Sequence, residues 1–321
     1  MPELILHAGA GKTGTSLLQV LFARHAEQLE RDKVIYPRGF LSDEAAAGYI
    51  TSGNGVAMAN YIRPHLPHDI GDKEAFIGDL GRELSGARGK HVLYSSEFLV
   101  FEPGERSNAI ATVAARNGYT PRVIYFVRDF GPAAFSTYSQ LVKRHGETRS
   151  FSEFINDWNP HYRERIEQAC AVFGPERVEV YNYDEKRDEL AAFFFRTLLR
   201  CQVVPPENPI VNRSLSAKET ELLRYMNAAL ASNAAQATFL SDALMEIATE
   251  TVPEPLLLTQ SEADLLESSF QSDLAYINGL IRGRPCVIAQ AVGDQRQQIE
   301  LTEFERATAA ILAKIVSVIV R

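Results

Sequence analysis

Short apolar runs alternate with longer stretches of helical periodicity over the first two thirds of the chain. The apolar runs of strand length cover residues 4–7, 34–36, 90–95, 122–127 and 177–183. The stretches whose apolar residues recur at helical spacing cover residues 13–29, 132–144, 151–173 and 187–199. Strands that are apolar throughout and alternate with helices predict a parallel sheet covered on both faces.

The pattern changes after Pro205-Pro206, where residues 216–280 are mainly helical with a loop near residues 253–255. Apolar residues at helical spacing also mark residues 307–321, which we interpret first as a core-packing helix, then as an oligomer contact and last as a membrane-surface helix. No flexible linker separates the two halves of the chain. We therefore predict a single domain over residues 1–321, with an α/β core over 1–210 and a mainly helical extension over 211–321.

Composition narrows the class of protein. The chain has 321 residues, of which 45% are hydrophobic, and a formal net charge of −8. The hydrophobic share is enough to bury a substantial core. The negative net charge argues against a general nucleic-acid binder. Three widely spaced cysteines without a C-x-x-C pair indicate a reducing compartment. Because we find no secretory signal and no apolar run of about 18 residues, we expect a cytoplasmic protein without a transmembrane segment.

The string HAGAGKTGTS over residues 7–16 carries the clearest chemistry. A glycine-rich turn between a strand and a helix lets backbone N–H groups converge on an anion, and the helix dipole favours the same charge. A lysine and three hydroxyl groups add further donors. We expect this loop to bind a phosphate or sulfate through Gly11, Lys12, Thr13, Gly14, Thr15 and Ser16.

The loop differs from the nucleotide-triphosphate pattern G-x-x-x-x-G-K-[ST]. Gly11-Lys12-Thr13 matches the end of that pattern, but its opening glycine would fall on Leu6, inside the strand. The glycine that follows the lysine, in Lys-Thr-Gly-Thr, also departs from it. Both differences favour a ligand other than ATP or GTP.

Lys12-Thr-Gly-Thr-Ser16 resembles the 5′-phosphosulfate loop of PAPS-dependent sulfotransferases, and HAGAGKTGTSLLQ is similar to their bacterial and glycan-type members. The resemblance implies a P-loop-containing three-layer α/β/α fold with a central parallel sheet and a helical C-terminal extension. It implies 3′-phosphoadenylyl sulfate (PAPS) as the sulfuryl donor, PAP as the product, and an acceptor hydroxyl or amine. By analogy we favour a carbohydrate acceptor.

The same resemblance implies a second anchor, in which an arginine at a strand end and a serine eight residues later hold the 3′-phosphate of the donor. Arg128 and Ser136 have this spacing, and the planar guanidinium suits two phosphate oxygens. The alternative is an ordinary ion pair of Arg128 with Asp129 or a neighbouring carboxylate. Phe130 stands where the family often has proline.

Two weaker matches follow. Tyr183 corresponds to a strand tyrosine near the adenine of related enzymes, although a half-buried strand tyrosine explains it equally well. Arg213, in NRSLS over residues 212–216, corresponds to a loop that closes over the 3′-phosphate, although a helix N-cap at Ser214 or Ser216 explains that string too. Leu17 replaces the aromatic residue that stacks on adenine in many members.

Sulfuryl transfer resembles phosphoryl transfer, because a loose in-line transition state needs positioning and positive charge. Lys12 suits the leaving phosphate, and Glu97, at the end of the third strand, is the candidate general base. A capping or ion-paired Glu97 is the alternative, and Asp43 or Glu44 is the rival base. We predict no metal site, because His65-Leu-Pro-His68, the nearest candidate, is interrupted by proline.

Two other classes of protein remain open. A P-loop nucleotide kinase or ATPase would bind Mg²⁺ through an acidic residue such as Asp184. A non-catalytic relative would bind the nucleotide without turnover. Acceptor specificity would lie in loops over residues 38–75 and 144–162 and in the helical tail.

Overall fold

The computed structural model divides into two compact units, each built from several segments of the chain. The first unit contains Met1–Arg128, His161–Val211 and Ser272–Cys286, and the second contains Asp129–Pro160, Asn212–Gln271 and Val287–Arg321. The structure describes residues 1–39, 42–49, 51–66, 72, 74–87, 89–205, 215–247, 258–288, 302, 305–306, 308–309 and 312. The prediction of a single domain over the whole chain stays a prediction.

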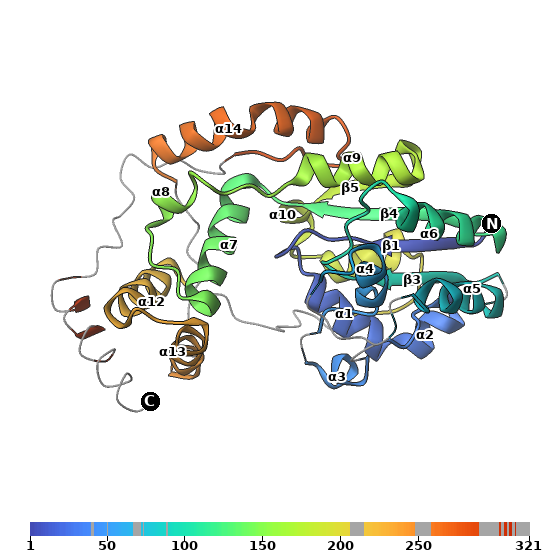
Figure 1. Ribbon diagram of the computed structural model, residues 1–321, viewed down its shortest axis with the longest axis horizontal. Helices are drawn as coiled ribbons and strands as arrows, with labels where there is room; N and C mark the ends of the chain where they lie inside the picture. Colours follow the sequence, from blue (N-terminus) through green and yellow to red (C-terminus); the bar gives the residue numbers. More distant parts are fainter. Residues whose placement is uncertain are drawn as a thin grey trace. The chain divides into compact units, whose positions relative to one another are not determined.

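The first unit is built around a five-stranded sheet in which every pairing is parallel (Figure 1). Its strands are β1 (Glu3–His7), β2 (Val34–Ile35), β3 (His91–Ser95), β4 (Thr120–Val127) and β5 (Val178–Asn182). Their order is β2-β3-β1-β4-β5. The predicted parallel α/β sheet is therefore confirmed, and β1 lies at its centre.

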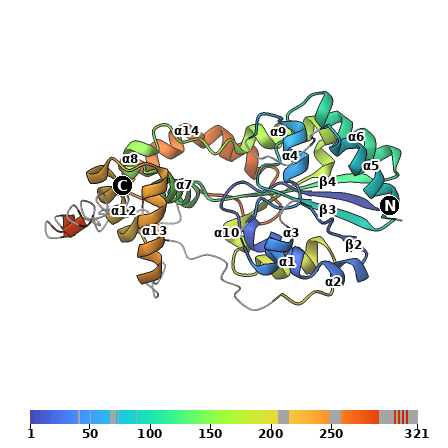
Figure 2. The same cartoon turned by 60° about the horizontal axis from the view of Figure 1, so that its bottom comes forward.

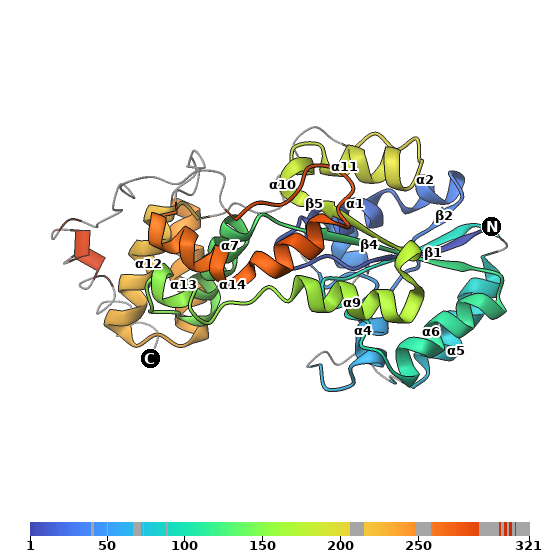
Figure 3. The ribbon, with the colours of Figure 1, turned by 90° about the horizontal axis from the view of Figure 1, so that it is seen from above.

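Helices cover both faces of this sheet, as the apolar strands indicated (Figures 2 and 3). Alternate strand residues such as Ile5 and Phe126 belong to a core cluster with residues of α1 (Thr15–Arg24). On the other face, the ring of Tyr94 packs edge-on against Phe76 of α5 (Phe76–Gly86) at 6.4 Å between centroids. The remaining helices of this unit that precede β4 are α2 (Ala26–Arg31), α3 (Ser42–Ala47), α4 (Val56–Ile62) and α6 (Glu105–Arg116).

Three of the predicted helices are interrupted or altered. The stretch 13–29 starts only at Thr15, because Gly14 is left-handed, and it breaks at His25 between α1 and α2. The stretch 151–173 contains α8 (Phe151–Phe154) and α9 (Tyr162–Phe173), since Pro160 disfavours helical backbone at the residue before it. The stretch 187–199 becomes α11 (Leu190–Ala192) and a π-helix over Phe193–Leu198.

The second unit contains α7 (Phe130–His145), α8, α12 (Ala217–Leu230) and α13 (Ala234–Ile247) (Figure 1). Asn227 of α12 donates to the carbonyl of Val142 on α7 at 2.8 Å, and both α12 and α13 pack against α7. The helix α14 (Gln260–Asn278) follows. The expected loop near 253–255 and most of the helix over 307–321 lie outside the described residues.

Three observations bear on the remaining expectations. The cysteines Cys170, Cys201 and Cys286 are free thiols. Within the described part of the chain, no helix has both the length and the apolar character needed to cross a membrane. Over the same residues, no group of three or more His, Cys, Asp or Glu side chains is placed to hold a metal ion.

Candidate functional site

The loop after β1 lies at the carboxyl edge of the sheet, where ligands of open α/β sheets bind. Its first residues continue along β4, because Ala8 N–H donates to Ile124 O at 3.0 Å and Ala10 N–H to Phe126 O at 3.3 Å. Lys12 then takes a left-handed conformation with φ 68° and is exposed. The predicted anion loop therefore sits on the central strand with its lysine open to solvent.

The first turn of α1 follows this loop and is suited to an anion. Its N-cap is Gly14, which has no side chain that could cap the first N–H groups, and the turn contains no acidic residue. Backbone N–H groups at a helix start lack intrahelical acceptors and carry the positive end of the dipole. Gly11 is exposed, and a Cβ at this position would meet nothing within 4 Å. A phosphate can therefore approach the loop backbone.

Gly14 is required by both its conformation and its surroundings. Its φ is +72°, and a Cβ there would lie 2.4 Å from Leu190 Cδ2 and 3.1 Å from Tyr183 Cε2. We expect Gly14→Ala to lower the free energy of unfolding by about 2–4 kcal/mol, which combines left-handed strain with the clash. Gly118→Ala is the matched control, because Gly118 has φ +78° but nothing within 4 Å of its Cβ position.

Urea unfolding of the two glycine variants measures this difference. In the control, left-handed strain alone should lower the free energy of unfolding, by about 1–2 kcal/mol. Equal losses in both variants would contradict the close packing of the loop against Leu190 and Tyr183.

The hydroxyl groups of the loop divide into two kinds. Thr13 is fully buried, and its hydroxyl donates to Ala10 O at 2.6 Å, so that its proton is used within the loop. Thr15 Oγ1 lies 3.4 Å from Thr13 Oγ1 and is also buried. Ser16 is half-buried at the start of α1. Of the three hydroxyls that the sequence offered as donors, that of Thr13 is already used within the loop, so Thr13 can contribute only its backbone N–H to a ligand.

Arg128 follows β4 and contacts both the phosphate loop and an acidic residue. Its Nη2 and Nε donate to the two carboxylate oxygens of Asp184 at 2.9 and 3.3 Å, and its Nη1 donates to Lys12 O at 3.3 Å. Burial disfavours the charged guanidinium, but the hydrogen bonds and charge of Asp184 outweigh it and raise the pKa of Arg128. The ion-pair alternative thus holds with Asp184 as the partner, and the pair lies directly against the loop.

Tyr183 contacts both Arg128 and the phosphate loop. It is the first residue of α10 (Tyr183–Lys186), one position beyond the strand on which we had placed it. Its ring lies 5.0 Å from the guanidinium carbon of Arg128, in cation–π geometry, and it also borders Gly14. The first unit therefore brings Lys12, Arg128 and Tyr183 together at one edge of the sheet.

Two predicted cofactor residues are not part of this cluster as described. Ser136 is half-buried on α7 and belongs to the second unit. Arg213 lies outside the described residues. The assignment of both residues to the 3′-phosphate stays a prediction.

Glu97 lies in the turn directly after β3 and is half-buried. The end of β3 is joined to β1, because Ser95 pairs with His7 and Ser96 N–H donates to His7 O at 3.1 Å. Glu97 therefore occupies the same edge of the sheet as the phosphate loop.

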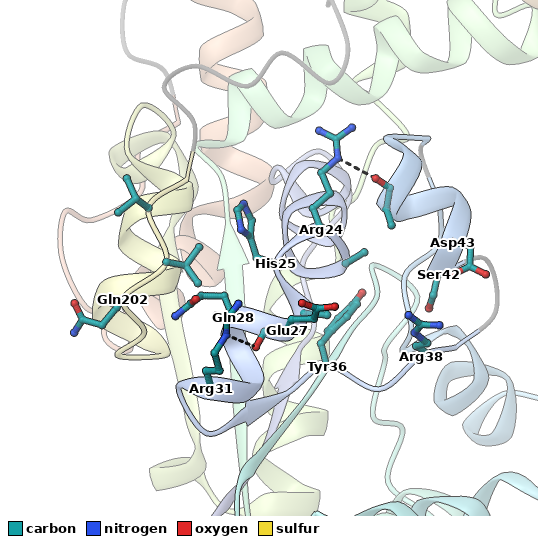
Figure 4. Close-up of a pocket in the computed structure, with 15 residues that line it drawn as sticks. Arg24, His25, Glu27, Gln28, Arg31, Tyr36, Arg38, Ser42, Asp43 and Gln202 are labelled. Atoms are coloured by element: carbon teal, nitrogen blue, oxygen red, sulfur yellow. Dashed lines mark hydrogen bonds between the residues drawn. The ribbon is translucent and has the colours of Figure 1, made fainter.

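The rival base Asp43 belongs to a different feature. A surface pocket of about 460 Å³ is lined by α1, α2, α3 and residues 202–204 (Figure 4). Its walls carry both charge signs, with Arg24, Arg31 and Arg38 opposed by Glu27 and Asp43. No residue of the loop 8–16 lines this pocket, nor does Glu97 or Arg128. The choice of Glu97 over Asp43 or Glu44 as the general base stays a prediction.

Sequence reasoning missed two residues of this site and misjudged a third. Asp184 was considered only as a magnesium ligand, and its 56-residue separation from Arg128 hid the pairing. His7 was included as the first residue of the loop string but was given no role. Gly9 carried no assignment, although its Cβ position lies 2.6 Å from Thr15 Oγ1, which explains why this loop position excludes a side chain.

No protein-family model matches the chain, and no curated protein matches it. Among solved structures, the fold is similar to a sulfotransferase from Alicyclobacillus acidocaldarius, at 18% identity and a TM-score of 0.39, over 77% of this chain and 96% of that one. It is also similar to a sulfotransferase domain from the curacin biosynthetic pathway, at 15% identity and a TM-score of 0.34, over 84% of this chain and 98% of that one.

Proposed function

We propose that this protein is a sulfotransferase that moves the sulfuryl group of PAPS to an acceptor hydroxyl or amine. The observation that carries the proposal is the direct contact between the two predicted phosphate anchors, in which Arg128 donates to the backbone of Lys12. A nucleotide phosphorylated at both its 5′ and 3′ positions needs two neighbouring cationic sites. The loop and Arg128 would supply them at one edge of the sheet.

The residues of the loop would act on the leaving group. The backbone N–H groups at the start of α1 and the ammonium of Lys12 would stabilise the negative charge that grows on the phosphate as its bond to sulfur breaks. The loop backbone is already held against β4 by the hydrogen bonds of Ala8 and Ala10, so these groups need little reorganisation. Glu97 would accept the proton of the acceptor as the new bond to sulfur forms.

The kinase alternative is supported less well. It needs an acidic residue free to bind Mg²⁺, and Asp184 was the candidate. The side chain of Asp184 is only 1% exposed, and both its oxygens accept hydrogen bonds from Arg128. A carboxylate engaged in this way is a poor magnesium ligand.

Calorimetry with PAP and with ATP–Mg²⁺ separates the two classes. We expect PAP to bind and ATP–Mg²⁺ to bind far more weakly. A sulfate-transfer assay with PAPS on a panel of sugars, alcohols and amines then identifies the acceptor, with carbohydrates tested first. Tight binding of ATP–Mg²⁺ together with no binding of PAP would overturn the proposal.

Glu97 provides a separate test of the mechanism. We expect Glu97→Gln to lower kcat by about 100-fold or more, because no carboxylate is left to take the proton from the substrate hydroxyl or amine. The affinity for PAP should stay unchanged. Glu102→Gln is the matched control, since Glu102 is exposed in the same segment after β3. Steady-state kinetics of both variants measure this effect, and near-normal turnover of Glu97→Gln would direct attention to Asp43 or Glu44.

We also propose that the protein acts in the cytoplasm of a bacterium. The three free thiols are compatible with a reducing compartment, and the loop string is similar to that of bacterial members.

A further inference from the structure

Arg63 directly follows α4 and contacts the segment that contains the proposed general base. Its Nη2 donates to Phe98 O at 2.7 Å, and Phe98 is the residue after Glu97. Its Nε is buried and has no hydrogen-bond partner among the described residues. Desolvation of a guanidinium is costly unless an acceptor or an anion compensates it. Arg63 therefore has a donor that the described part of the protein does not use.

Arg165 on α9 is a second half-buried cation in the same region. Both α4 and α9 pack against α6, and they lie side by side on one face of the sheet (Figures 2 and 3). Burial lowers the pKa of Arg63, and the nearby positive charge of Arg165 lowers it further. Arg165 also lies close to Tyr125 on β4, because it opposes the rise that burial causes in the pKa of that hydroxyl. Two like charges thus share one partly desolvated region.

This region has no ion-paired carboxylate of its own. Neither Arg63 nor Arg165 forms an ion pair with another described residue. Arg122 and Arg128, which are also half-buried in the first unit, each pair with a carboxylate. The charge of Glu102 raises the pKa of Arg63, against the effect of burial, but Glu102 is exposed and is not ion-paired with it. An anionic ligand would supply the missing charge.

Two buried tyrosines connect this region with the proposed donor site. Tyr162 of α9 is buried beside Arg128, whose charge opposes the rise that burial causes in the pKa of Tyr162. Tyr125 acts on the same hydroxyl and lies next to Arg165. Arg63 and Arg165 therefore extend the cationic edge of the sheet that begins at Arg128.

We propose that Arg63 and Arg165 form an anion subsite for the acceptor, which therefore carries a carboxylate or a sulfate near the hydroxyl or amine that receives the sulfuryl group. This inference rests on the proposed function, because it places the acceptor beside Glu97. Planar guanidinium donors suit the oxygens of either anion. The Nε of Arg63 would donate one of these hydrogen bonds, and the bound charge would offset the repulsion between the two arginines.

NMR of the arginine Nε–H groups tests the subsite without turnover. The wild-type protein is first saturated with PAP, so that added anions do not occupy the donor site. It is then titrated with sodium sulfate or sodium acetate at constant ionic strength. We expect the Nε–H signals of Arg63 and Arg165 to shift and to saturate with at least one of the two anions. Arg116 is the control, since it is exposed at the end of α6 near the opposite edge of the sheet, and its signal should stay unchanged.

Matched acceptor pairs provide the second test. Methyl glucoside and methyl glucuronide differ by a carboxylate, and glucose and glucose 6-sulfate differ by a sulfate. With PAPS, we expect kcat/KM to be about 10- to 100-fold higher for the anionic member of at least one pair, the effect of charge-assisted hydrogen bonds, and the preferred pair identifies the anion. Arg63→Gln and Arg165→Gln should reduce this preference to within about threefold, whereas Arg116→Gln should keep it.

The outcomes separate the inference from the proposed function. A wild-type protein that fails to bind PAP overturns the proposed function, and the acceptor role of the two arginines with it. Normal PAP binding, with Arg63 and Arg165 signals that neither anion moves, overturns the inference alone, even if the variants prove too unstable to assay. Equal losses of kcat/KM for both members of a pair in the glutamine variants would also overturn it, since a purely structural role predicts that result.

Discussion

Replacing Lys12 with alanine is expected to lower kcat for sulfuryl transfer by about 100- to 1,000-fold, the usual effect of removing one preorganised charge from a transition state. Lys12 is exposed at the tip of the loop, so stability should change by no more than about 0.5 kcal/mol. Single-turnover kinetics with PAPS, together with urea unfolding, separate the two effects. Turnover within about threefold of wild type would remove Lys12 from the mechanism.

Lys33 offers a closely matched control for that experiment. It has φ 67°, against 68° for Lys12, and is also exposed. It precedes β2 and accepts from His91 N–H at the start of β3, so it lies at the opposite edge of the parallel sheet. Lys33→Ala removes the same charge from the same backbone conformation, and we expect it to leave kcat unchanged.

Replacing Arg128 with methionine is expected to weaken PAP binding by about 10- to 100-fold, because the guanidinium charge and its charge-assisted hydrogen bonding to the 3′-phosphate are lost. The same change leaves the carboxylate of Asp184, whose side chain is 1% exposed, buried without its cation. Breaking such a pair costs about 3–5 kcal/mol of unfolding free energy. Calorimetry and urea unfolding report the two losses independently.

Variants at Asp184 separate binding from stability. The double variant Arg128→Met/Asp184→Asn removes the unpaired charge and should recover part of the lost stability, but not the affinity for PAP. Asp184→Asn alone leaves the guanidinium uncompensated, and we expect PAP to bind it at least as tightly as the wild type. Recovery of PAP affinity in the double variant would show that Arg128 acts only through the fold.

The strands of this protein could be predicted well because each is an apolar run buried on both faces. Ile5, Leu93 and Ile124 face one helix layer, while their neighbours face the other, so periodicity and burial agree. Helix boundaries were harder to predict, because the breaks at His25 and in the loop over 155–161 depend on local backbone conformation. The grouping of segments on both sides of residue 210 into one compact unit has no signal in the local sequence.

The candidate site could be predicted in its local part only. The loop around Lys12 is contiguous, so its glycines and hydroxyls are visible as a motif. The pairing of Arg128 with Asp184 joins residues after two adjacent strands, and it becomes visible only when the sheet order is known. The burial of His7 was missed for the same reason, because the residues around its ring come from β3, β4, α1 and the π-helix.

The contact between Arg128 and Lys12 also determines when the site can form during synthesis of the chain. The two residues are 116 positions apart, and β4 must add beside β1 before they can meet. At about 5–20 residues per second, a ribosome needs about 6–23 s to make the intervening chain. During that interval the nascent loop lacks its second cationic partner, so a stalled chain that ends before β4 should not retain PAP.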